Sequence, residues 1–332
     1  MASFKVMTWN IESFFQPTAG ASPAEADTYQ RKLELLASVI NQEAPDIVAL
    51  QEVGGDGALQ DLQQQLGGAY PHRIISTHPD ARGIRVAFLS KQAIDMQEEF
   101  FNLAQGPALD IHDITDTGAS TPITHMSRGA VHVHVDVNGI ALDLITAHLK
   151  SKLLSFPRPN NKTSFAPRDE DERAQVAGIA LLKREAEAVT LRLQINKLLG
   201  TNPPPNLIML GDLNDVPDAQ TTLIFSGPPG SEIGTRGFNT PDKGDPQRMF
   251  NVTLVLPPDQ RYSRIDAGRK EMIDHILVSA GLLPVDNGQR RLPLVKSLVN
   301  FQGQLGSVTN DPNERVGKVA PDHAPVTASF TI

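Results

Sequence analysis

Residues 207–217 read LIMLGDLNDVP, an apolar run that ends at Asp212 and is closed by Pro217. An apolar run of this length followed by a turn signal predicts a buried strand with polar groups at its C-terminal end. Successive side chains of a strand point to opposite faces, so Asp212 and Asn214 share one face while Leu213 packs on the other. A carboxylate and a carboxamide at a rigid strand end can orient a water molecule or a phosphate. The alternative is an ordinary strand-to-turn transition.

Five further segments share this character, an apolar run with polar groups at its edge. They read FKVMTWNI (4–11), PDIVALQEV (45–53), IALDLITAHLKS (140–151), MIDHILVS (272–279) and PDHAPVTASFTI (321–332). The polar residues that they present are Asn10, Gln51, Glu52, His148, Lys150, Asp274, Asp322 and His323. We expect each segment to be a strand, the last one opening at Asp322 and His323. Meeting at one rim of a sheet, these ends would form a site of carboxylates, amides and two histidines.

In their order, TWNI, LQEV, HLKS, GDLND, IDHILVS and PDHAPV resemble the motif series of the endonuclease/exonuclease/phosphatase superfamily. Its members include deoxyribonuclease I, apurinic endonucleases and neutral sphingomyelinases. The resemblance runs from Asn10 to His323 and implies one α/β domain over residues 1–332, with a loop and helix insertion around residues 151–205. The implied fold is a four-layer α/β sandwich of two facing, mainly antiparallel sheets flanked by helices. The implied activity is metal-dependent phosphodiester hydrolysis at their common edge.

The resemblance also implies a role for each matched residue. The implied metal ligands are Asn10, Glu52 and Asp322, with Glu52 as the principal one. Asp212 is expected to orient or deprotonate the attacking water, Asn214 to hold a phosphate oxygen, and His323 to stabilise the pentacoordinate phosphorus. Asp274 is expected to lie behind these groups as a supporting carboxylate.

His148 matches the histidine of deoxyribonuclease-like and sphingomyelinase-like members. Apurinic endonucleases carry a tyrosine at that position, which argues against repair of abasic sites. The fragment HLKSK and the later Arg173 resemble bacterial nuclease-like members more weakly, and they make Lys150 and Arg173 candidate substrate contacts. For Arg173, the alternative is a surface ion pair with Glu170.

Phosphodiester chemistry favours the same set of groups. The transition state concentrates negative charge on non-bridging oxygens, so the reaction needs a divalent ion together with cationic or donor groups. Hard oxygen ligands such as those of Glu52, Asp322 and Asn10 suit Mg²⁺ or Mn²⁺. Zinc prefers sulfur and several imidazoles, whereas this chain has no cysteine and no His-x-x-x-His spacing. We therefore expect Mg²⁺, or Mn²⁺, as the cofactor.

Composition bounds the class of protein. The 332 residues are 40% hydrophobic and 20% charged, which suits one large core. The absence of cysteine excludes disulfides and fits a reducing compartment. The N-terminus enters the first predicted strand without a signal-peptide pattern, and no apolar run reaches the roughly 18 residues of a membrane span. The default expectation is a cytoplasmic protein with no transmembrane segment and no obligate protein partner; secretion after removal of a leader is the alternative.

The net charge of −8 is unusual for a nuclease, because phosphate neutralisation supplies most nucleic-acid affinity. Residues 150–168, in contrast, contain no acid. Their cations are Lys150, Lys152, Arg158, Lys162 and Arg168, interspersed with Phe156 and Phe165. Basic and aromatic side chains alternate in this way where proteins contact single strands. The segment is either a substrate-facing loop or a solvated basic loop.

Two helices are predicted around the strand motifs. Asp169 as N-cap, with Glu172 three residues later and acids in the first turn, predicts a helix over residues 170–199 that Gly200 ends. An earlier helix is expected over residues 29–42. Histidines outside the motif series are expected to be structural: His275 points away from Asp274, and the alternation VHVHVDV (131–137) indicates a polar sheet face rather than a ligand array.

Two catalytic hypotheses remain. The first is a nuclease that hydrolyses DNA or RNA by metal-assisted, in-line attack of water, favoured by the basic segment and the HLKSK pattern. The second is a sphingomyelinase-like or small phosphate-ester phosphodiesterase, favoured by the acidic total charge. A non-catalytic scaffold is a third class, which the intact set of site residues disfavours. Nucleic acid is the expected partner, as substrate.

Overall fold

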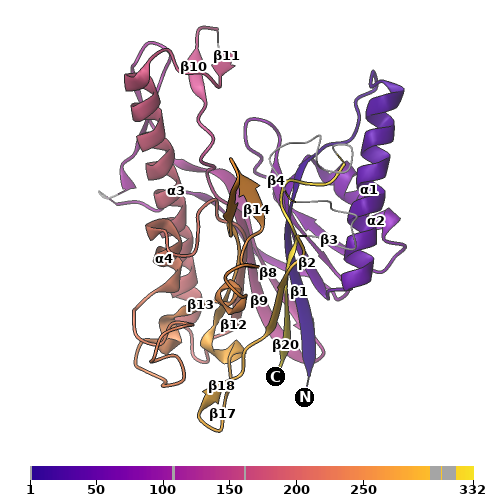
Figure 1. Cartoon of the computed structure of the whole chain (residues 1–332), viewed down its shortest axis with the longest axis vertical. Coiled ribbons are helices and arrows are strands. Elements are labelled where there is room, and N and C mark those ends of the chain that lie inside the picture. Colours follow the sequence, from indigo (N-terminus) through magenta and orange to yellow (C-terminus); the bar gives the residue numbers. More distant parts are fainter. Residues whose placement is uncertain (1, 107–108, 161, 300–307, 309–318) are drawn as a thin grey trace.

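The computed structural model describes residues 2–106, 109–160, 162–299, 308 and 319–332. This part of the chain is a sandwich of four layers, in which two facing sheets lie between two layers of helices (Figure 1). The two ends of the chain lie side by side at one end of the sandwich, where Ser3 pairs with Thr331. The predicted four-layer α/β sandwich is therefore confirmed.

Each sheet contains six strands. In spatial order the first sheet is β19 (Leu294–Ser297), β20 (Val326–Thr331), β1 (Ser3–Phe14), β2 (Ile47–Val53), β4 (Arg85–Ser90) and β3 (His72–Ile75). The second is β13 (Met249–Asn251), β16 (Asp274–Ser279), β12 (Asn206–Asp212), β9 (Ile140–His148), β8 (His125–Val137) and β5 (Asp95–Asn102).

The direction of the strands brings the motif residues to one edge. One pair in each sheet is parallel, β1 with β2 and β9 with β12, and the neighbouring pairs are antiparallel. The C-terminal ends of β9 and β12 therefore lie beside the N-terminal ends of β8 and β16. The C-terminal end of β2 likewise lies beside the N-terminal end of β4. A hydrogen bond between Asn10 and Asp212 joins these edges of the two sheets.

Helices cover the outer face of each sheet, and small hairpins extend from the loops. The helices are α1 (Pro23–Glu43), α2 (Asp56–Gln65), α3 (Glu170–Leu199) and α4 (Gln220–Ser226), with short 3-10 helices at Asp245–Gln247, Val252–Val255 and Ala280–Leu282. The hairpins pair β6 (His112–Ile114) with β7 (Ser120–Pro122), β10 (Phe156–Arg158) with β11 (Lys162–Ser164), β14 (Arg264–Asp266) with β15 (Arg269–Glu271), and β17 (Val285–Asp286) with β18 (Gln289–Arg290). The β10–β11 hairpin and α3 occupy the segment predicted as an insertion.

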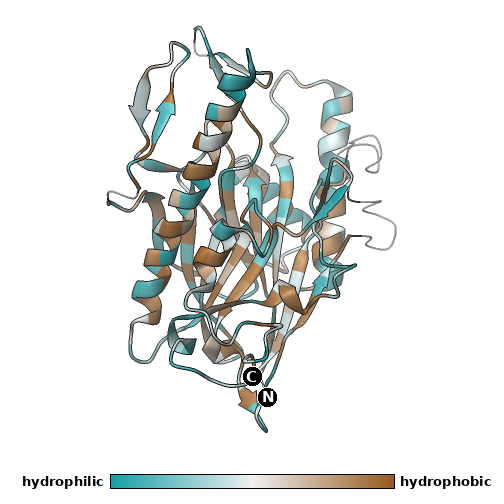
Figure 2. Ribbon diagram, turned by 60° about the vertical axis from the view of Figure 1, so that its left-hand side comes forward, coloured by the Kyte–Doolittle hydropathy of each residue, from teal (hydrophilic) through white to brown (hydrophobic). Residues whose placement is uncertain are grey.

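Three layers of apolar side chains hold the sandwich together. Between the sheets, residues such as Val6 and Phe88 of the first sheet pack against Leu144 and Leu210 of the second. A second cluster joins α1 and α2 to the first sheet, and a third joins α3 and α4 to the second sheet. The inner strands of the two sheets are hydrophobic over much of their length (Figure 2). Each fully buried aliphatic side chain contributes about 1.5–3 kcal/mol, so the sheets form a rigid support for the groups at their edge.

The predicted helices occur, one of them with a different start. The helix α3 has the predicted bounds, and the Asp169 side chain accepts a hydrogen bond from the Glu172 amide as its N-cap. The helix α1 begins at Pro23, six residues before the prediction, because Ser22 and Glu25 form a reciprocal capping box. Its first turns lack apolar periodicity, so the capping pattern was the available signal.

Two strand predictions need correction. The last strand begins at Val326, so Asp322 and His323 lie in the preceding loop rather than in the strand. Pro325 has no N–H to donate to a ladder and stands directly before the strand. The second correction concerns two strand ends: β9 ends at His148 and β12 at Asp212, so Lys150 and Asn214 lie outside their strands and the face predicted from strand alternation does not apply to them. Within the described residues, no helix is both long and apolar enough to cross a membrane.

Candidate active site

Three neighbouring strands of the second sheet place acidic and imidazole groups side by side. Asp212, the last residue of β12, pairs with His148 of β9 on one side and with Asp274 of β16 on the other. From the facing sheet, Asn10 of β1 donates its Nδ2 hydrogen to Asp212 Oδ2 over 3.0 Å. His323 enters from the loop before β20. The structure thus brings together residues from five predicted motifs.

Asp212 is the centre of this cluster. Its Oδ2 lies 3.3 Å from His148 Nε2 and 3.9 Å from His323 Nε2, and its Oδ1 accepts the Asn214 amide hydrogen over 2.9 Å. Burial raises the pKa of Asp212 to about 7, although His323 acts in the opposite direction. A carboxyl group with a pKa near neutrality can take up a proton at physiological pH.

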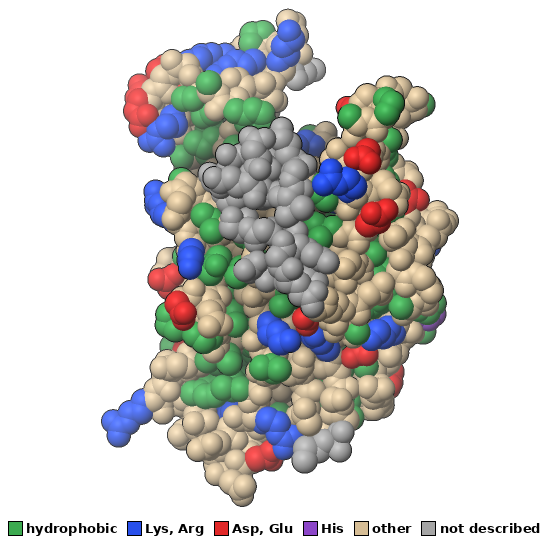
Figure 3. Space-filling view, turned by 45° about the vertical axis from the view of Figure 1, so that its right-hand side comes forward, with side chains coloured by type: hydrophobic (Ala, Val, Ile, Leu, Met, Phe, Trp, Pro, Cys, Tyr) green, Lys and Arg blue, Asp and Glu red, His purple; other side chains and the backbone are tan. Residues whose placement is uncertain are grey.

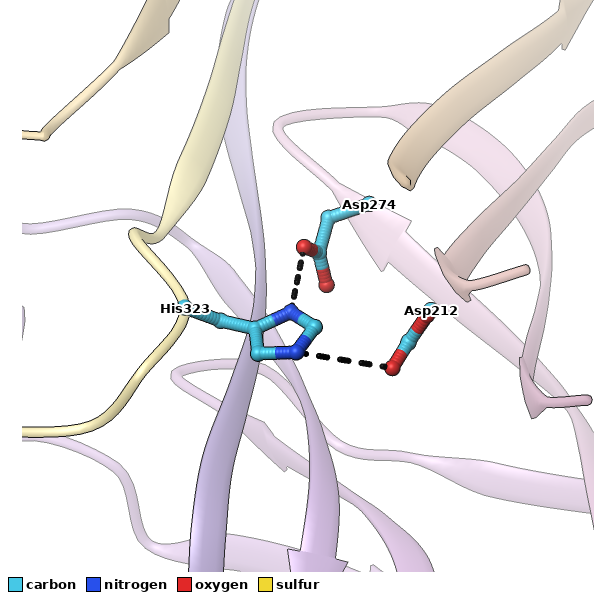
Figure 4. A group of neighbouring side chains, drawn as sticks. All are labelled: Asp212, Asp274 and His323. Atoms are coloured by element: carbon cyan, nitrogen blue, oxygen red, sulfur yellow. Dashed lines mark hydrogen bonds and ion pairs between the residues drawn. The ribbon is translucent and has the colours of Figure 1, made fainter. Parts of the chain in front are cut away.

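His323 is held between two carboxylates, as Figure 4 shows. Its Nδ1 lies 2.7 Å from Asp274 Oδ2, and the Trp9 indole donates to its backbone carbonyl over 2.9 Å. Burial alone would lower the pKa of His323, but Asp274, Asp322 and Asp212 together raise it to about 10. His323 is therefore an imidazolium at neutral pH, fixed in orientation by Asp274, with Nε2 facing Asp212 Oδ2.

His148 has the opposite charge state. Burial and the nearby Arg128 guanidinium hold its pKa well below the ordinary value, so the ring is neutral. A neutral imidazole carries one N–H and one lone pair on its ring nitrogens. The two histidines around Asp212 are thus a neutral ring and a cation. Titratable groups whose surroundings push them into different states mark acid and base assignments in active sites.

The turn after β12 explains the GDLND sequence. A side chain at Gly211 would place a Cβ 2.0 Å from the Ala147 carbonyl oxygen, so only glycine permits the close pairing with β9. Asn214 has a left-handed backbone, with φ 55°, a conformation that asparagine tolerates well. Its Nδ2 donates to the Leu149 carbonyl over 3.0 Å, and the second Nδ2 hydrogen remains for a ligand.

The predicted metal ligands are connected by one short segment, Glu12–Ser13, at a register break of β1. The Glu12 amide donates to Asn10 Oδ1 over 3.0 Å, and the Ser13 amide donates to Glu52 Oε2 over 2.8 Å. The Glu12 side chain also accepts the backbone N–H of Asp322 over 3.1 Å. The Glu12–Ser13 segment therefore contacts all three residues, through the side-chain oxygens of Asn10 and Glu52 and the backbone N–H of Asp322.

These hard oxygen donors fit a divalent cation such as Mg²⁺ or Mn²⁺. A second acidic group, formed by Asp212, Asp274 and His323, also has its ligand atoms close together. That group is a poorer set of ligands, because His323 Nδ1 is already bound to Asp274 and a protonated imidazole has no lone pair to offer. The chemistry of the donor groups thus favours Asn10, Glu52 and Asp322 over Asp212, Asp274 and His323 as the candidate ligands of a divalent cation.

The two predicted substrate contacts, Lys150 and Arg173, have partners within the protein. The strand ends before Lys150, so it does not share a face with His148, and its Nζ donates to the carbonyls of Ser151 and Leu153. Burial lowers the pKa of Lys150 to about 8, and the nearby Lys183 and Arg128 add to this effect. Arg173 lies on the exposed surface, ion-paired with Glu170 three residues earlier on the helix.

Three of the five cations of the predicted basic segment are paired with acids. Arg158 and Arg168 both bind Glu172, and Lys152 lies 3.2 Å from Asp215 Oδ1 and 3.6 Å from Glu271 Oε1. The sequence could not show this, because the acids lie outside residues 150–168. Gln51 also differs from the prediction. It is buried between the sheets, where its Nε2 donates to Thr146 Oγ1 over 3.1 Å.

Sequence reasoning missed a buried clamp that links α3 to the catalytic edge. Glu187 accepts the Ser127 amide at Oε1 and the Lys150 amide at Oε2, each over 2.6 Å. One turn earlier, Arg184 binds Asp215 Oδ2 and the Lys150 carbonyl, over 3.1 and 3.2 Å. Two charged residues in the buried face of the helix were the signal available in the sequence.

Arg128 is a second missed residue. Although almost completely buried, it donates to the His148 and Leu149 carbonyls, each over 3.3 Å, and lies 3.2 Å from Asp80 Oδ2. It therefore supports the end of β9 that carries His148. Its place three residues before the VHVHVDV segment did not distinguish it from a surface arginine.

The histidines predicted to be structural have structural partners. His275 is buried and hydrogen-bonds Asn251 Nδ2 through Nδ1 and the Asp215 carbonyl through Nε2, over 3.0 and 2.8 Å. Its neighbour Asp274 faces His323. On the outer face of β8, His132 and His134 flank the Asp143 carboxylate. Both arrangements follow from the alternation of side chains along a strand.

This end of the molecule is notched in the space-filling view. One projection holds the β10–β11 hairpin with the start of α3, and the other holds the start of α1 (Figure 3). The catalytic strand ends lie at the same end of the sandwich.

Comparison with known proteins agrees with this geometry. A sequence model of the Endonuclease/Exonuclease/phosphatase family matches residues 7–301, and this match confirms the resemblance carried by the motif series. No curated protein matches the sequence.

Several solved structures share the fold. One is ANGEL2, a 2′,3′-cyclic phosphatase, in complex with adenosine-2′,3′-vanadate, with a TM-score of 0.57, 14% identity and coverage of 99% of this chain and 95% of that one. Another is D. rerio TDP2 complexed with a single strand DNA product, with a TM-score of 0.54, 14% identity and coverage of 100% of both chains. The human nocturnin catalytic domain with a bound sulfate anion has a TM-score of 0.53 and 15% identity, with coverage of 99% and 94%.

Proposed function

The chain belongs to the endonuclease/exonuclease/phosphatase family of phosphoester hydrolases, and from this premise we propose that it is a divalent-metal-dependent nuclease that hydrolyses phosphodiester bonds of DNA or RNA. The observation that carries the proposal is the environment of Asp212. Its carboxylate lies between a neutral His148 and a cationic His323, with a pKa raised to about 7 by burial. This arrangement suits a base that takes a proton from an attacking water molecule.

Each residue has a defined part in the proposed reaction. Asp212 accepts a proton from the water that attacks phosphorus opposite the leaving oxygen. The His323 imidazolium, held by Asp274, stabilises the charge that develops on a non-bridging oxygen. Asn214 offers its remaining Nδ2 hydrogen to a second oxygen, and the neutral His148 ring packs beside Asp212, with Nε2 3.3 Å from Oδ2.

Glu52 and Asn10, with Asp322 nearby, are the residues that would hold Mg²⁺ or Mn²⁺. When bound, the cation supplies Lewis-acid stabilisation of the pentacoordinate phosphorus. Its positive charge would also lower the pKa of Asp212 and so favour the carboxylate form that accepts the proton. The Glu12–Ser13 amides hold the ligand oxygens of Asn10 and Glu52 in place without it.

Two fold relatives support a nucleotide substrate, because D. rerio TDP2 is complexed with single strand DNA and ANGEL2 with an adenosine-2′,3′-vanadate. One observation favours the lipid alternative. Leu153 and Phe165, on either side of the β10–β11 hairpin, are 56% and 69% exposed, and exposed apolar side chains beside a site can enter a lipid surface.

A substrate panel tests the proposal. The purified protein is assayed with Mg²⁺, Mn²⁺, Zn²⁺ or EDTA against labelled single-stranded DNA, duplex DNA, RNA and sphingomyelin vesicles. We expect cleavage of a nucleic acid that requires Mg²⁺ or Mn²⁺, stops in EDTA and is lost in Asp212→Asn. Hydrolysis of sphingomyelin without cleavage of any polymer would replace the nuclease proposal with the lipid alternative.

A further inference from the structure

Three aromatic rings from separate segments form a continuous stack. The His78 ring lies parallel to the Phe101 ring, with centroids 4.1 Å apart and planes 3° apart. The other neighbour of Phe101 is His125, at 4.6 Å and 31°. His78 belongs to the loop between β3 and β4, Phe101 to β5 and His125 to the first residue of β8. We call this group the aromatic ladder.

The register of the sheets places the aromatic ladder at the catalytic edge. Asn102, next to Phe101, pairs with His125 at the start of β8, and β8 runs antiparallel to β9, which ends at His148. The loop with His78 leads into β4, whose first residue Arg85 pairs with Val53 at the end of β2. The aromatic ladder therefore bridges the two sheets at the end that carries Glu52 and His148.

A chain of charged contacts joins the aromatic ladder to the catalytic residues. Asp80, two residues after His78, accepts from Arg82 Nη2 over 3.1 Å and lies 3.2 Å from Arg128 Nη2. Arg128 in turn donates to the His148 carbonyl. Asp80 thus joins the buried Arg128 to Arg82, whose side chain is 52% exposed.

The ring of His78 is held in place from β5. The Thr77 amide donates to Glu99 Oε1 over 2.7 Å, and Glu99 Oε2 lies 3.5 Å from His78 Nε2. Gly129 permits the loop to approach, because a Cβ there would lie 2.9 Å from the His78 Cβ. The parallel stack is thus fixed before any ligand binds. The end rings still reach solvent, since His78 is 39% exposed and His125 is exposed.

We propose that the aromatic ladder is a nucleobase-stacking subsite for single-stranded nucleic acid, with Arg82 beside it contacting a backbone phosphate; this rests on the proposed nuclease function. A stack that served only the core would not need exposed rings, whereas both end rings of this stack, His78 and His125, reach solvent beside the catalytic strand ends. Planar rings bind every base through its π-face, so the subsite selects a single strand over a duplex rather than one sequence over another. An abasic sugar offers no such face.

The test uses a 12-nucleotide oligo(dT) and a series in which one thymidine, at successive distances from the cleaved bond, is replaced by an abasic residue. At one position, the wild type should lose roughly 5- to 150-fold in kcat/KM, the value of one stacked base. In Phe101→Leu that position-specific loss should shrink to less than twofold, because the ring that fixes the stack is absent. His125→Leu, at an exposed position that does not threaten folding, should reduce it as well.

Met96→Leu is the matched control, since Met96 is exposed on the same strand but paired with Val133, away from the catalytic edge. It should keep the full abasic loss. A loss of the same size in wild type, Phe101→Leu and His125→Leu would overturn the subsite while leaving the nuclease proposal intact. Failure of the wild type to cleave any single or double strand would overturn both, so the two failures are distinguishable.

Discussion

The clamp on α3 yields a prediction whose size follows from its contacts. Glu187 is buried, and each of its carboxylate oxygens accepts one backbone amide, from Ser127 and from Lys150. In Glu187→Gln the side chain keeps its shape but has one oxygen and one NH₂ group. One of the two amides then faces a donor and loses its acceptor, whichever way the carboxamide turns.

The expected cost follows from that lost bond. A hydrogen bond to a charged group contributes about 1.5–3 kcal/mol, and leaving a buried donor unsatisfied costs about 1–3 kcal/mol. We therefore expect the free energy of unfolding to fall by about 3 kcal/mol. With a urea m-value of about 3 kcal/mol/M, the midpoint should move by roughly 1 M.

Glu187 should also affect catalysis, because Ser127 precedes Arg128 and Lys150 follows the segment that carries His148. A displacement of about 1 Å in a reacting group can cost roughly 10²-fold in rate. At a temperature where the variant is fully folded by near-UV circular dichroism, kcat should fall by about 10- to 100-fold while KM changes little. Glu185→Gln, exposed on the same helix, is the matched control and should leave both unchanged. A folded Glu187→Gln enzyme with kcat within twofold of wild type would show that the clamp supports only the fold.

The remaining predictions concern the metal, the histidines, the basic segment and a buried lysine. Glu52→Gln should weaken Mg²⁺ binding measured by calorimetry and activity together; unchanged binding would remove Glu52 from the metal site. His148→Ala and His323→Ala should each lower kcat by about 10²-fold or more, whereas His275→Ala should lower stability and leave kcat nearly intact; equal losses in all three would contradict the strand-face assignment. Each phosphate contact contributes roughly 0.7–0.9 to the slope of log K against log salt. Neutralising Lys152, Arg158, Lys162 and Arg168 together should reduce this slope by less than the sum for four contacts, because three of the four side chains are ion-paired within the protein. A reduction equal to four contacts would mean that these ion pairs open when nucleic acid binds. The pKa of Lys150 is lowered to about 8 in the folded protein, so between about pH 8 and the ordinary 10.5 the unfolded chain holds a proton on this lysine that the folded chain has lost. Burial of the charged lysine therefore destabilises the fold most below pH 8. Lys150→Met should raise the free energy of unfolding, measured with urea, most below pH 8, and this gain should decline as pH rises towards 10.5.

Strand alternation predicted much of the site because it is a local rule that the fold preserves. Asp274 and His275 are consecutive in β16, and they face opposite sides as expected. The same rule failed for Lys150, because it applies only while the chain stays in the strand and β9 ends at His148. The N-cap of α3 was predictable for a similar reason, since Asp169 and Glu172 interact within one turn.

Contacts between distant segments were outside the reach of the sequence. The partners of Glu187 are 60 and 37 residues away, and Arg158 is neutralised by an acid of the next helix. Hydropathy and spacing describe which residues are buried or share a face, but not which buried charge meets which amide. The acidic total charge was equally uninformative about the site, because the state of each histidine depends on its immediate neighbours.

The backbone around the predicted metal ligands is strained in a way that serves the site. Glu12, Ser13 and Glu52 all have left-handed backbones, with φ of 49°, 48° and 65°, and none of them is glycine. Such conformations cost on the order of 1–3 kcal/mol each, a large fraction of the roughly 5–15 kcal/mol that stabilises a domain. The turn directs two consecutive amides, of Glu12 and Ser13, at Asn10 Oδ1 and Glu52 Oε2. In the proposed metal site, those amides would fix the ligand oxygens before a cation arrives, so binding would not have to order them. On this proposal the strain is the cost of a preformed site, and it is concentrated where β1 leaves its register with β2.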